Sequence, residues 1–118
     1  DSNKVLVIVS MTGSGSLYAI NYRLLRATSE LGLGADHGGN RNRTTFSSSG
    51  DYDTSGDTMN TATYTYLDSP SSTSEETYKI QCSHRSTGTV SINRTATTTD
   101  SAWLHAGTST ITVMEIEG

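Results

Sequence analysis

The sequence predicts an all-β fold, an antiparallel β-sandwich, from its composition and its hydropathy pattern. Apolar residues make up only 32% of the chain and charged residues 17%, so neutral polar side chains dominate, with 20 Thr and 18 Ser. Thr and the six Tyr favour pleated, half-exposed strands. Apolar and polar residues alternate over short segments between polar turns, and no segment has the spacing of a helix longer than two turns.

The length predicts a single domain over residues 1–118, because 118 residues bury one modest core. The net charge of −4 and the many β-branched residues argue against disorder. The chain opens at Asp1-Ser2-Asn3 without an initiator Met, so we expect processing or excision from a longer parent.

The first predicted strand covers residues 4–11, a β-branched run that is apolar on both faces and therefore typical of a strand covered on both sides. The valines at 5, 7 and 9 need one cover, whereas Leu6 and Ile8 need a second, which a neighbouring subunit would supply. A Gly/Ser turn at 13–16 and an alternating run at 17–26, with Ile20, Tyr22 and Leu24 on one face, predict a β-hairpin with this strand.

The middle of the chain contributes little core. Over residues 27–60 apolar residues give way to Gly, Ser, Asn and Asp, and only 43–47 is expected to form a short strand. So long a loop is either functional or hides a missed element. Residues 61–67 then alternate Thr with Ala and Tyr as a long strand, which ends before Pro70.

Three further strands are predicted in the second half. Residues 76–83 place Tyr78, Ile80 and Cys82 on one face, 89–94 point Val90 and Ile92 inward, and 109–117 do the same with Ile111 and Val113. Six to eight short strands with polar turns indicate an antiparallel sandwich and favour a jelly roll.

Charge and cysteine usage exclude several classes of protein. A net charge of −4 gives no electrostatic footprint for nucleic acid, and the local pair Arg41 and Arg43 is interpreted as solvated loop charge. The single Cys82 forms no intrachain disulfide and is expected to be a small buried hydrophobe. No apolar run approaches the ~20 residues of a membrane span, and no signal-peptide pattern is present.

No metal, cofactor or catalytic site is predicted. Asp51, Asp53 and Asp57 surround a glycine bend as Ca²⁺ ligands do, but Ala62 stands where an EF-hand needs Glu, so a solvated turn is favoured. The three His residues have no metal-ligand spacing, and no Gly-x-Ser-x-Gly elbow or singled-out acid pair indicates a hydrolase. We therefore expect a protein that is not an enzyme.

Two regions are candidate binding sites. Trp103 is the only Trp and stands beside Leu104 in a polar loop, where a role in the core or at a subunit interface is favoured over ligand stacking. Residues 34–57 contain hydrogen-bonding and aromatic side chains that could bind a polar saccharide, namely Arg41, Asn42, Tyr52 and Asp53. The alternative interpretation is a structured but inert loop.

Four phrases in the second half carry a family resemblance: Tyr-Leu-Asp-Ser-Pro at 66–70, Thr-Tyr-Lys-Ile-Gln at 77–81, Val-Ser-Ile-Asn-Arg at 90–94, and Gly-Thr-Ser-Thr-Ile-Thr-Val-Met-Glu-Ile at 107–116. With them, the sequence resembles C-terminal domains of tailed-phage virion proteins, particularly those of marine and cyanobacterial phages. The resemblance implies a homotrimeric, TNF/C1q-like jelly roll similar to tail-fibre tips, head fibres or capsid decoration proteins. It brings no catalytic signature.

Two functions follow from this resemblance. One is a fibre or appendage tip in the virion that contacts the host cell surface, with a host glycan as the candidate ligand. The other is a capsid decoration protein that stabilises the head. Both imply other virion proteins as partners, and neither implies nucleic acid or membrane insertion. An enzyme that depolymerises envelope sugar is the third and weakest reading, because no catalytic constellation is found.

Overall fold

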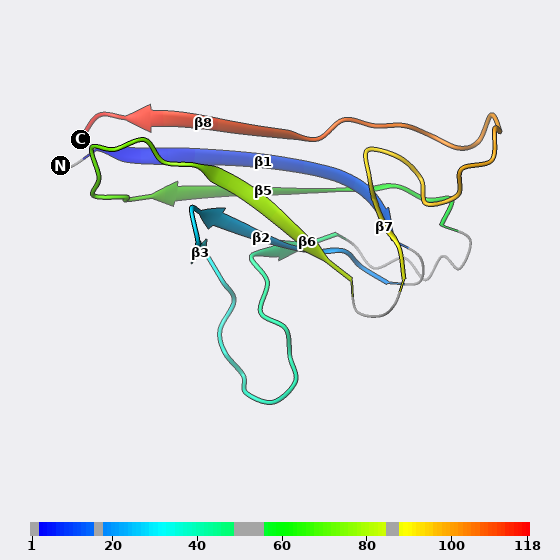
Figure 1. The fold of residues 1–118 in the computed structure, drawn as a ribbon, viewed down its shortest axis with the longest axis horizontal. Coiled ribbons are helices and arrows are strands. Elements are labelled where there is room, and N and C mark those ends of the chain that lie inside the picture. The colour runs from blue at the N-terminus through cyan, green and yellow to red at the C-terminus, as the bar shows by residue number, and fades with distance from the viewer. Residues whose placement is uncertain (1–2, 16–17, 49–55, 85–87) are drawn as a thin grey trace.

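The computed structural model describes residues 3–15, 18–48, 56–84 and 88–118, and all regular elements in these ranges are β-strands (Figure 1). They form two antiparallel sheets, which confirms the all-β prediction and is consistent with a β-sandwich. The strands are β1 (Lys4–Gly15), β2 (Asn21–Arg26), β3 (Ser29–Leu31), β4 (Phe46–Ser47), β5 (Asn60–Asp68), β6 (Tyr78–Ser83), β7 (Val90–Ile92) and β8 (Thr110–Ile116).

The first sheet, called the β1 sheet, is built around its longest strand. β5 lies along one edge of β1, from Val5 opposite Asp68 to Gly13 opposite Asn60. β8 and β7 share the other edge, β8 along the first half of β1 and β7 along its last three residues. The two ends of the chain therefore lie side by side at one end of the molecule (Figure 1).

The second sheet, called the β2 sheet, also has four strands in the described residues, but they are shorter than β1 and β5. β6 pairs with β2 along one edge, and the short strands β3 and β4 occupy the other. The connection between β3 and β4, residues 32–45, projects away from both sheets (Figure 1).

The core lies between the facing sides of the two sheets. Val7 and Val9 of β1 are fully buried against Leu24 of β2 and Leu31 of β3. Burying each such side chain contributes about 1.5–3 kcal/mol. A row of four stacked rings extends this core from β2 to β5, with centroids 4.9, 5.4 and 6.3 Å apart; the rings belong to Tyr22, Phe46, Tyr64 and Tyr66.

The predicted hairpin is wrong, because β1 and β2 belong to different sheets. β1 runs on through the predicted turn to Gly15, and β2 begins only at Asn21. Gly13 serves close strand approach instead of a turn, since a Cβ there would lie 2.8 Å from the carbonyl oxygen of Ser91. The inward face of β2 is as predicted, with Ile20, Tyr22 and Leu24 buried.

The remaining strands follow the prediction more closely. The runs at 76–83, 89–94 and 109–117 contain β6, β7 and β8, whereas β5 extends one residue beyond the run at 61–67 at each end. The strand expected at 43–47 shrinks to β4. β3 was not predicted. It forms because the chain reverses through Ala27, at a φ of 50°, and brings Leu31 back onto Leu24.

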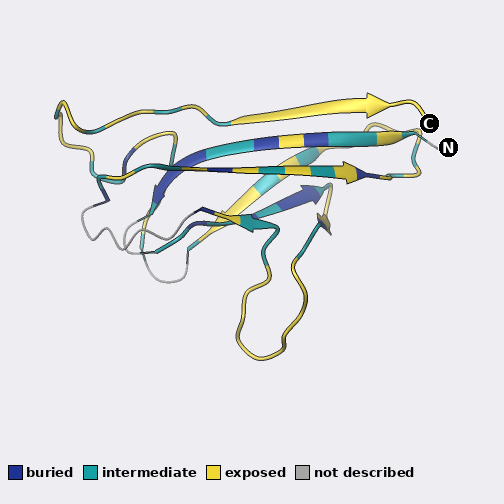
Figure 2. Cartoon of the chain, turned by 180° about the vertical axis from the view of Figure 1, so that it is seen from behind, coloured by how far each residue is buried: buried dark blue, intermediate teal, exposed yellow. Residues whose placement is uncertain are grey.

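Three residues that were predicted to be buried are exposed. Ile111 and Val113 share the inward face with Val9 and Val7, yet they remain 42% and 46% exposed, because the shorter strands of the β2 sheet do not cover β8 (Figure 2). Cys82 pairs with the buried Tyr22 but is exposed, so the prediction of a buried thiol is wrong. Cys82 lies near the end of β6, which is an edge strand of the β2 sheet. At such a position the alternating direction of side chains does not ensure that the other sheet covers an inward residue.

Candidate functional site

The predicted binding residues do not converge on one site. Arg41 and Asn42 lie in the projecting loop 32–45, and Trp103 lies in the connection between β7 and β8. Tyr52 and Asp53, like Asp51 of the acidic turn, lie outside the described residues. The described chain thus offers three separate candidate regions: the projecting loop, the Trp103 connection and a cavity near the chain ends.

The projecting loop is closed at its neck by hydrogen bonds. Gly34 N donates to the carbonyl oxygen of Thr44 at 3.0 Å, and Arg43 Nε donates to the carbonyl oxygen of Gly34 at 2.8 Å. Arg23 of β2 donates in turn to the carbonyl oxygen of Arg43 at 2.9 Å. Arg43 therefore braces the loop while remaining exposed, and Arg41 is exposed beyond this neck, so both are solvated loop charges as expected.

Asn42 lines a polar hollow on the β2 sheet. Asn42 and the guanidinium group of Arg23, which belongs to β2, border a cavity of about 430 Å³ together with residues of β6. The Arg23 guanidinium also pairs with Glu30 at 2.6 Å, so its charge is balanced there. The other lining residues are Gln81, Cys82 and Ser83. These groups suit hydrogen bonding to a polar ligand, but the described lining contains no aromatic ring.

Trp103 is 71% exposed, so its predicted role in the core is wrong. The loop that carries it is held by backbone contacts on both sides: Thr95 N donates to the carbonyl oxygen of His105 at 3.2 Å, and Gly107 N to that of Asn93 at 2.8 Å. The indole is therefore displayed on a braced loop. Leu104, beside it, is half-buried and lines an adjacent cavity of about 390 Å³.

The lining of this adjacent cavity is rich in hydroxyl groups. Besides Leu104 it contains Arg94, Thr95, Thr97, Thr98, Thr99, Asp100, Ser101, His105 and Ala106. The hydroxyl, carboxylate and imidazole groups of this lining can bind a polar ligand. Trp103 does not itself line the cavity, but its chain neighbours Leu104 and His105 do. Sequence reasoning identified Trp103 but missed these neighbours, because scattered Thr residues give no local signal.

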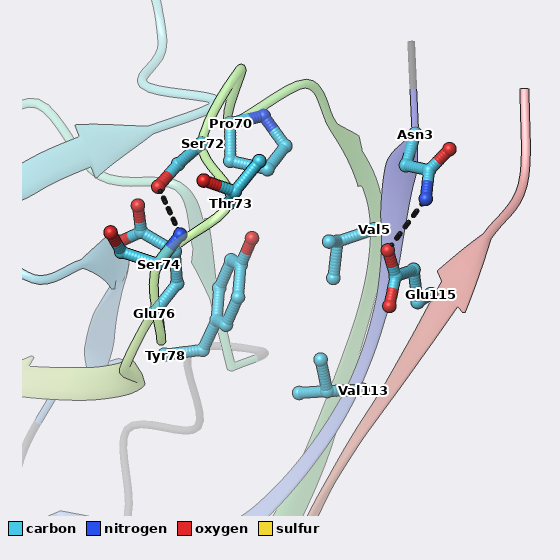
Figure 3. A pocket seen from close by; sticks show the side chains of 10 residues that line it. All are labelled: Asn3, Val5, Pro70, Ser72, Thr73, Ser74, Glu76, Tyr78, Val113 and Glu115. Atoms are coloured by element: carbon cyan, nitrogen blue, oxygen red, sulfur yellow. Dashed lines mark hydrogen bonds between the residues drawn. The ribbon is translucent and has the colours of Figure 1, made fainter. Parts of the chain in front are cut away.

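A third cavity, of about 430 Å³, opens between the sheets near the chain ends (Figure 3). Tyr78 and Glu76 stand on one side, and Val5 and Val113 on the other. Asn3, Pro70, Ser72, Thr73, Ser74 and Glu115 complete its lining. No sequence signal predicted this cavity, because its walls come from segments that are distant in the chain.

A buried carboxylate closes the core beside this third cavity. Asp68 is 5% exposed, and its Oδ2 accepts hydrogen bonds from Arg26 at 2.6 Å and from the Tyr78 hydroxyl at 2.8 Å. Burial and the bond to Asp68 raise the pKa of Tyr78 to about 12. The phenol stays protonated at neutral pH and donates its hydrogen bond to Asp68, so this pair stabilises the fold.

The described residues contain neither a metal-binding group nor a membrane-spanning helix. No three His, Cys, Asp or Glu side chains in these ranges are placed to hold a metal ion. Within the same ranges, no helix is long and apolar enough to cross a membrane. No protein-family model, curated protein or solved structure matches this chain.

Proposed function

We propose that the chain is a non-enzymatic surface domain of a tailed-phage virion, a homotrimeric fibre or appendage tip that presents the Trp103 loop to the host cell surface. The observation that supports this proposal most strongly is the position of Trp103. It is 71% exposed, and its loop lies at the end of the molecule opposite both termini (Figure 1). A domain joined to a virion through its termini holds that loop outward.

The exposed indole supports a binding role for physical reasons. A Trp that is largely in water contributes little to the core, and Trp is enriched among the residues that dominate binding energy. Its flat apolar ring packs well against the apolar side of a sugar or another ligand. The neighbouring hydroxyl-rich cavity supplies hydrogen-bonding groups, so a host surface glycan is the proposed ligand class.

The arrangement of the strands supports the proposed jelly roll. Eight strands are divided between two four-stranded sheets, and the first and last strands of the chain are neighbours. The trimer is supported by β1, whose outward residues Leu6 and Ile8 are left without cover by the second sheet. The location in a phage virion is supported by the sequence resemblance alone, whose phrases fall in and beside β5, β6, β7 and β8.

The test compares Trp103→Ala with wild type for binding to cells of the phage host. The variant should bind about ten-fold or more weakly, because losing a central aromatic typically costs more than 1.4 kcal/mol. Its melting temperature should not change, since the side chain is exposed. Asn42→Ala in the projecting loop is the matched control and should bind like wild type.

Two outcomes would reject this assignment. If Trp103→Ala binds host cells as wild type does, the indole is not the contact. If Asn42→Ala abolishes binding instead, the contact belongs to the hollow on the β2 sheet.

Capsid decoration is the second candidate, favoured by the uncovered apolar residues on the outside of the β1 sheet, which suit binding to a capsid lattice. The number of copies per virion separates the two functions. Quantitative mass spectrometry of purified particles should find a few dozen copies or fewer for a fibre tip, and hundreds for a decoration protein.

A further inference from the structure

The outer face of the β1 sheet, turned away from the β2 sheet, carries a group of apolar side chains that we call the outer apolar face. Leu6 stands directly opposite Leu67 on β5 and Met114 on β8, so the three form a row across the sheet. The members of the group are Leu6, Ile8, Leu67, Met114 and Ile116. The last four are 38%, 48%, 44% and 42% exposed. An apolar row of this kind on one face of a sheet marks an interaction surface.

Strand β8 borders this face and is a long, regular edge strand. It pairs with β1 over seven consecutive residues without a bulge, and all seven are exposed (Figure 2). In the described chain its other edge has no strand partner. Natural edge strands are normally short, bulged, or interrupted by charged residues or Pro. Thr110–Ile116 has no Lys and no Pro, and its single charged residue, Glu115, accepts a hydrogen bond from Asn3 at 2.7 Å.

The exposed area of the chain exceeds that of a compact monomer. The accessible surface is 7284 Å², whereas a monomer of 12.6 kDa exposes about 6,200 Å². The excess of about 1,100 Å² is larger than the ~800 Å² that each partner buries in a standard interface. The projecting loop 32–45 accounts for part of this excess, but residues 34–43 of that loop are mostly polar, whereas the outer face and β8 supply apolar area.

The structure points to a second copy of this chain as the occupant: we propose that copies cover one another's outer apolar face and β8. Lys4 is the only charged residue among the outward positions of β1, β5 and β8, so copies of the chain can meet on this surface with little charge repulsion. The face also has no charged patch that would require an oppositely charged partner. This inference rests on the proposed self-assembly and assigns the surface that carries it.

The experiment is sedimentation at micromolar concentrations of wild type, of Leu67→Lys/Met114→Lys and of Gln81→Lys. Wild type should sediment at about three times 12.6 kDa. The double variant should dissociate about ten-fold or more readily, because it places two charges inside the interface. Gln81→Lys adds a charge at an exposed position of the β2 sheet and should keep the wild-type mass.

Circular dichroism checks that each variant is folded. If the double variant does not fold, hydrogen exchange of wild type replaces it: amides of β8 should become more protected as concentration rises. A monomeric wild type, an unchanged mass in the double variant, or equal dissociation in Gln81→Lys each overturns the inference. Host-cell binding of Trp103→Ala is measured separately, so a failure of the receptor function remains distinguishable from a failure of this interface.

Discussion

A single carboxylate organises one end of the core. Asp68 ends β5, and its two oxygens accept hydrogen bonds from Arg26 on β2, from Tyr78 on β6 and from the backbone N–H of Ser69. Glu76 lies 4.0 Å from Arg26 Nε and adds a weaker attraction. Because Asp68 belongs to the β1 sheet and its two side-chain partners, Arg26 and Tyr78, belong to the β2 sheet, Asp68 ties the sheets together beside the cavity of Figure 3.

Replacing Asp68 by Asn should destabilise the fold by about 2–3 kcal/mol, because it removes a buried charge that two half-buried donors share. Chemical denaturation measures this loss. Asp36→Asn is the control, since Asp36 is exposed and its Oδ1 accepts one local bond from Gly38 N. It should change stability by less than about 0.5 kcal/mol. Equal effects of the two variants would show that Asp68 does not connect the sheets.

Two buried phenols predict a loss of stability in alkali. The pKa of Tyr22 is raised to about 12 by burial, and that of Tyr78 to about 12 by burial and its bond to Asp68. Since both values lie above the ordinary 10.0, the neutral phenols stabilise the folded state fully below pH 10. This stability is lost as pH rises through 10 toward 12.

The measurement is the free energy of unfolding between pH 9 and about pH 12, compared between wild type and Tyr22→Phe/Tyr78→Phe. The double variant should have a flatter profile over this window, because it no longer has those two protons to lose. Parallel profiles for the two proteins would contradict the raised pKa values.

At the scale of elements, β1 is the strand on which the β1 sheet depends. It pairs with β5 along one edge and with β8 and β7 along the other. Its last residues accept β7 because Gly13 has no side chain: an added Cβ would meet the backbone oxygen of Ser91 at 2.8 Å and Ile20 Cδ1 at 3.1 Å. A backbone oxygen in a paired strand cannot move away cheaply.

Gly13→Ala should therefore lower stability by about 1–3 kcal/mol, the usual cost of overpacking. Thermal unfolding followed by circular dichroism measures it. Gly34→Ala is the matched control, since the nearest atom to its added Cβ is 3.6 Å away, an ordinary contact. If both variants are as stable as wild type, β7 does not pack against Gly13 as described.

At the scale of the whole molecule, the two sheets differ in the length of their strands, and the longer β1 sheet leaves β8 exposed. The chain measures 51 × 37 × 18 Å, and its radius of gyration of 16.1 Å exceeds the ~13.5 Å of a compact domain of this length. In this flat molecule the outer face of the β1 sheet, turned away from the β2 sheet, remains in water. Self-association through that face would bury the apolar side chains that the fold itself leaves exposed.

The alternation of residues along each strand was readable from the sequence. Ile20, Tyr22 and Leu24 were predicted to face inward and are buried, and Leu6 with Ile8 were predicted to need a second cover, which this chain does not provide. Side-chain direction in a strand repeats every two residues, so neighbouring residues suffice to predict it. The all-β class and the approximate positions of seven strands depend on this local property.

Only the tertiary structure decided which strands pair and which faces are covered. β1 continues through Gly13 into the β1 sheet and leaves β2 to the other, although the sequence suggested a hairpin. Trp103, Val113 and Cys82 lie in water because no described segment covers them, and the cavity near the chain ends joins β1, β6 and β8. Cover and pairing depend on segments far apart in the chain, and local alternation contains no information about them.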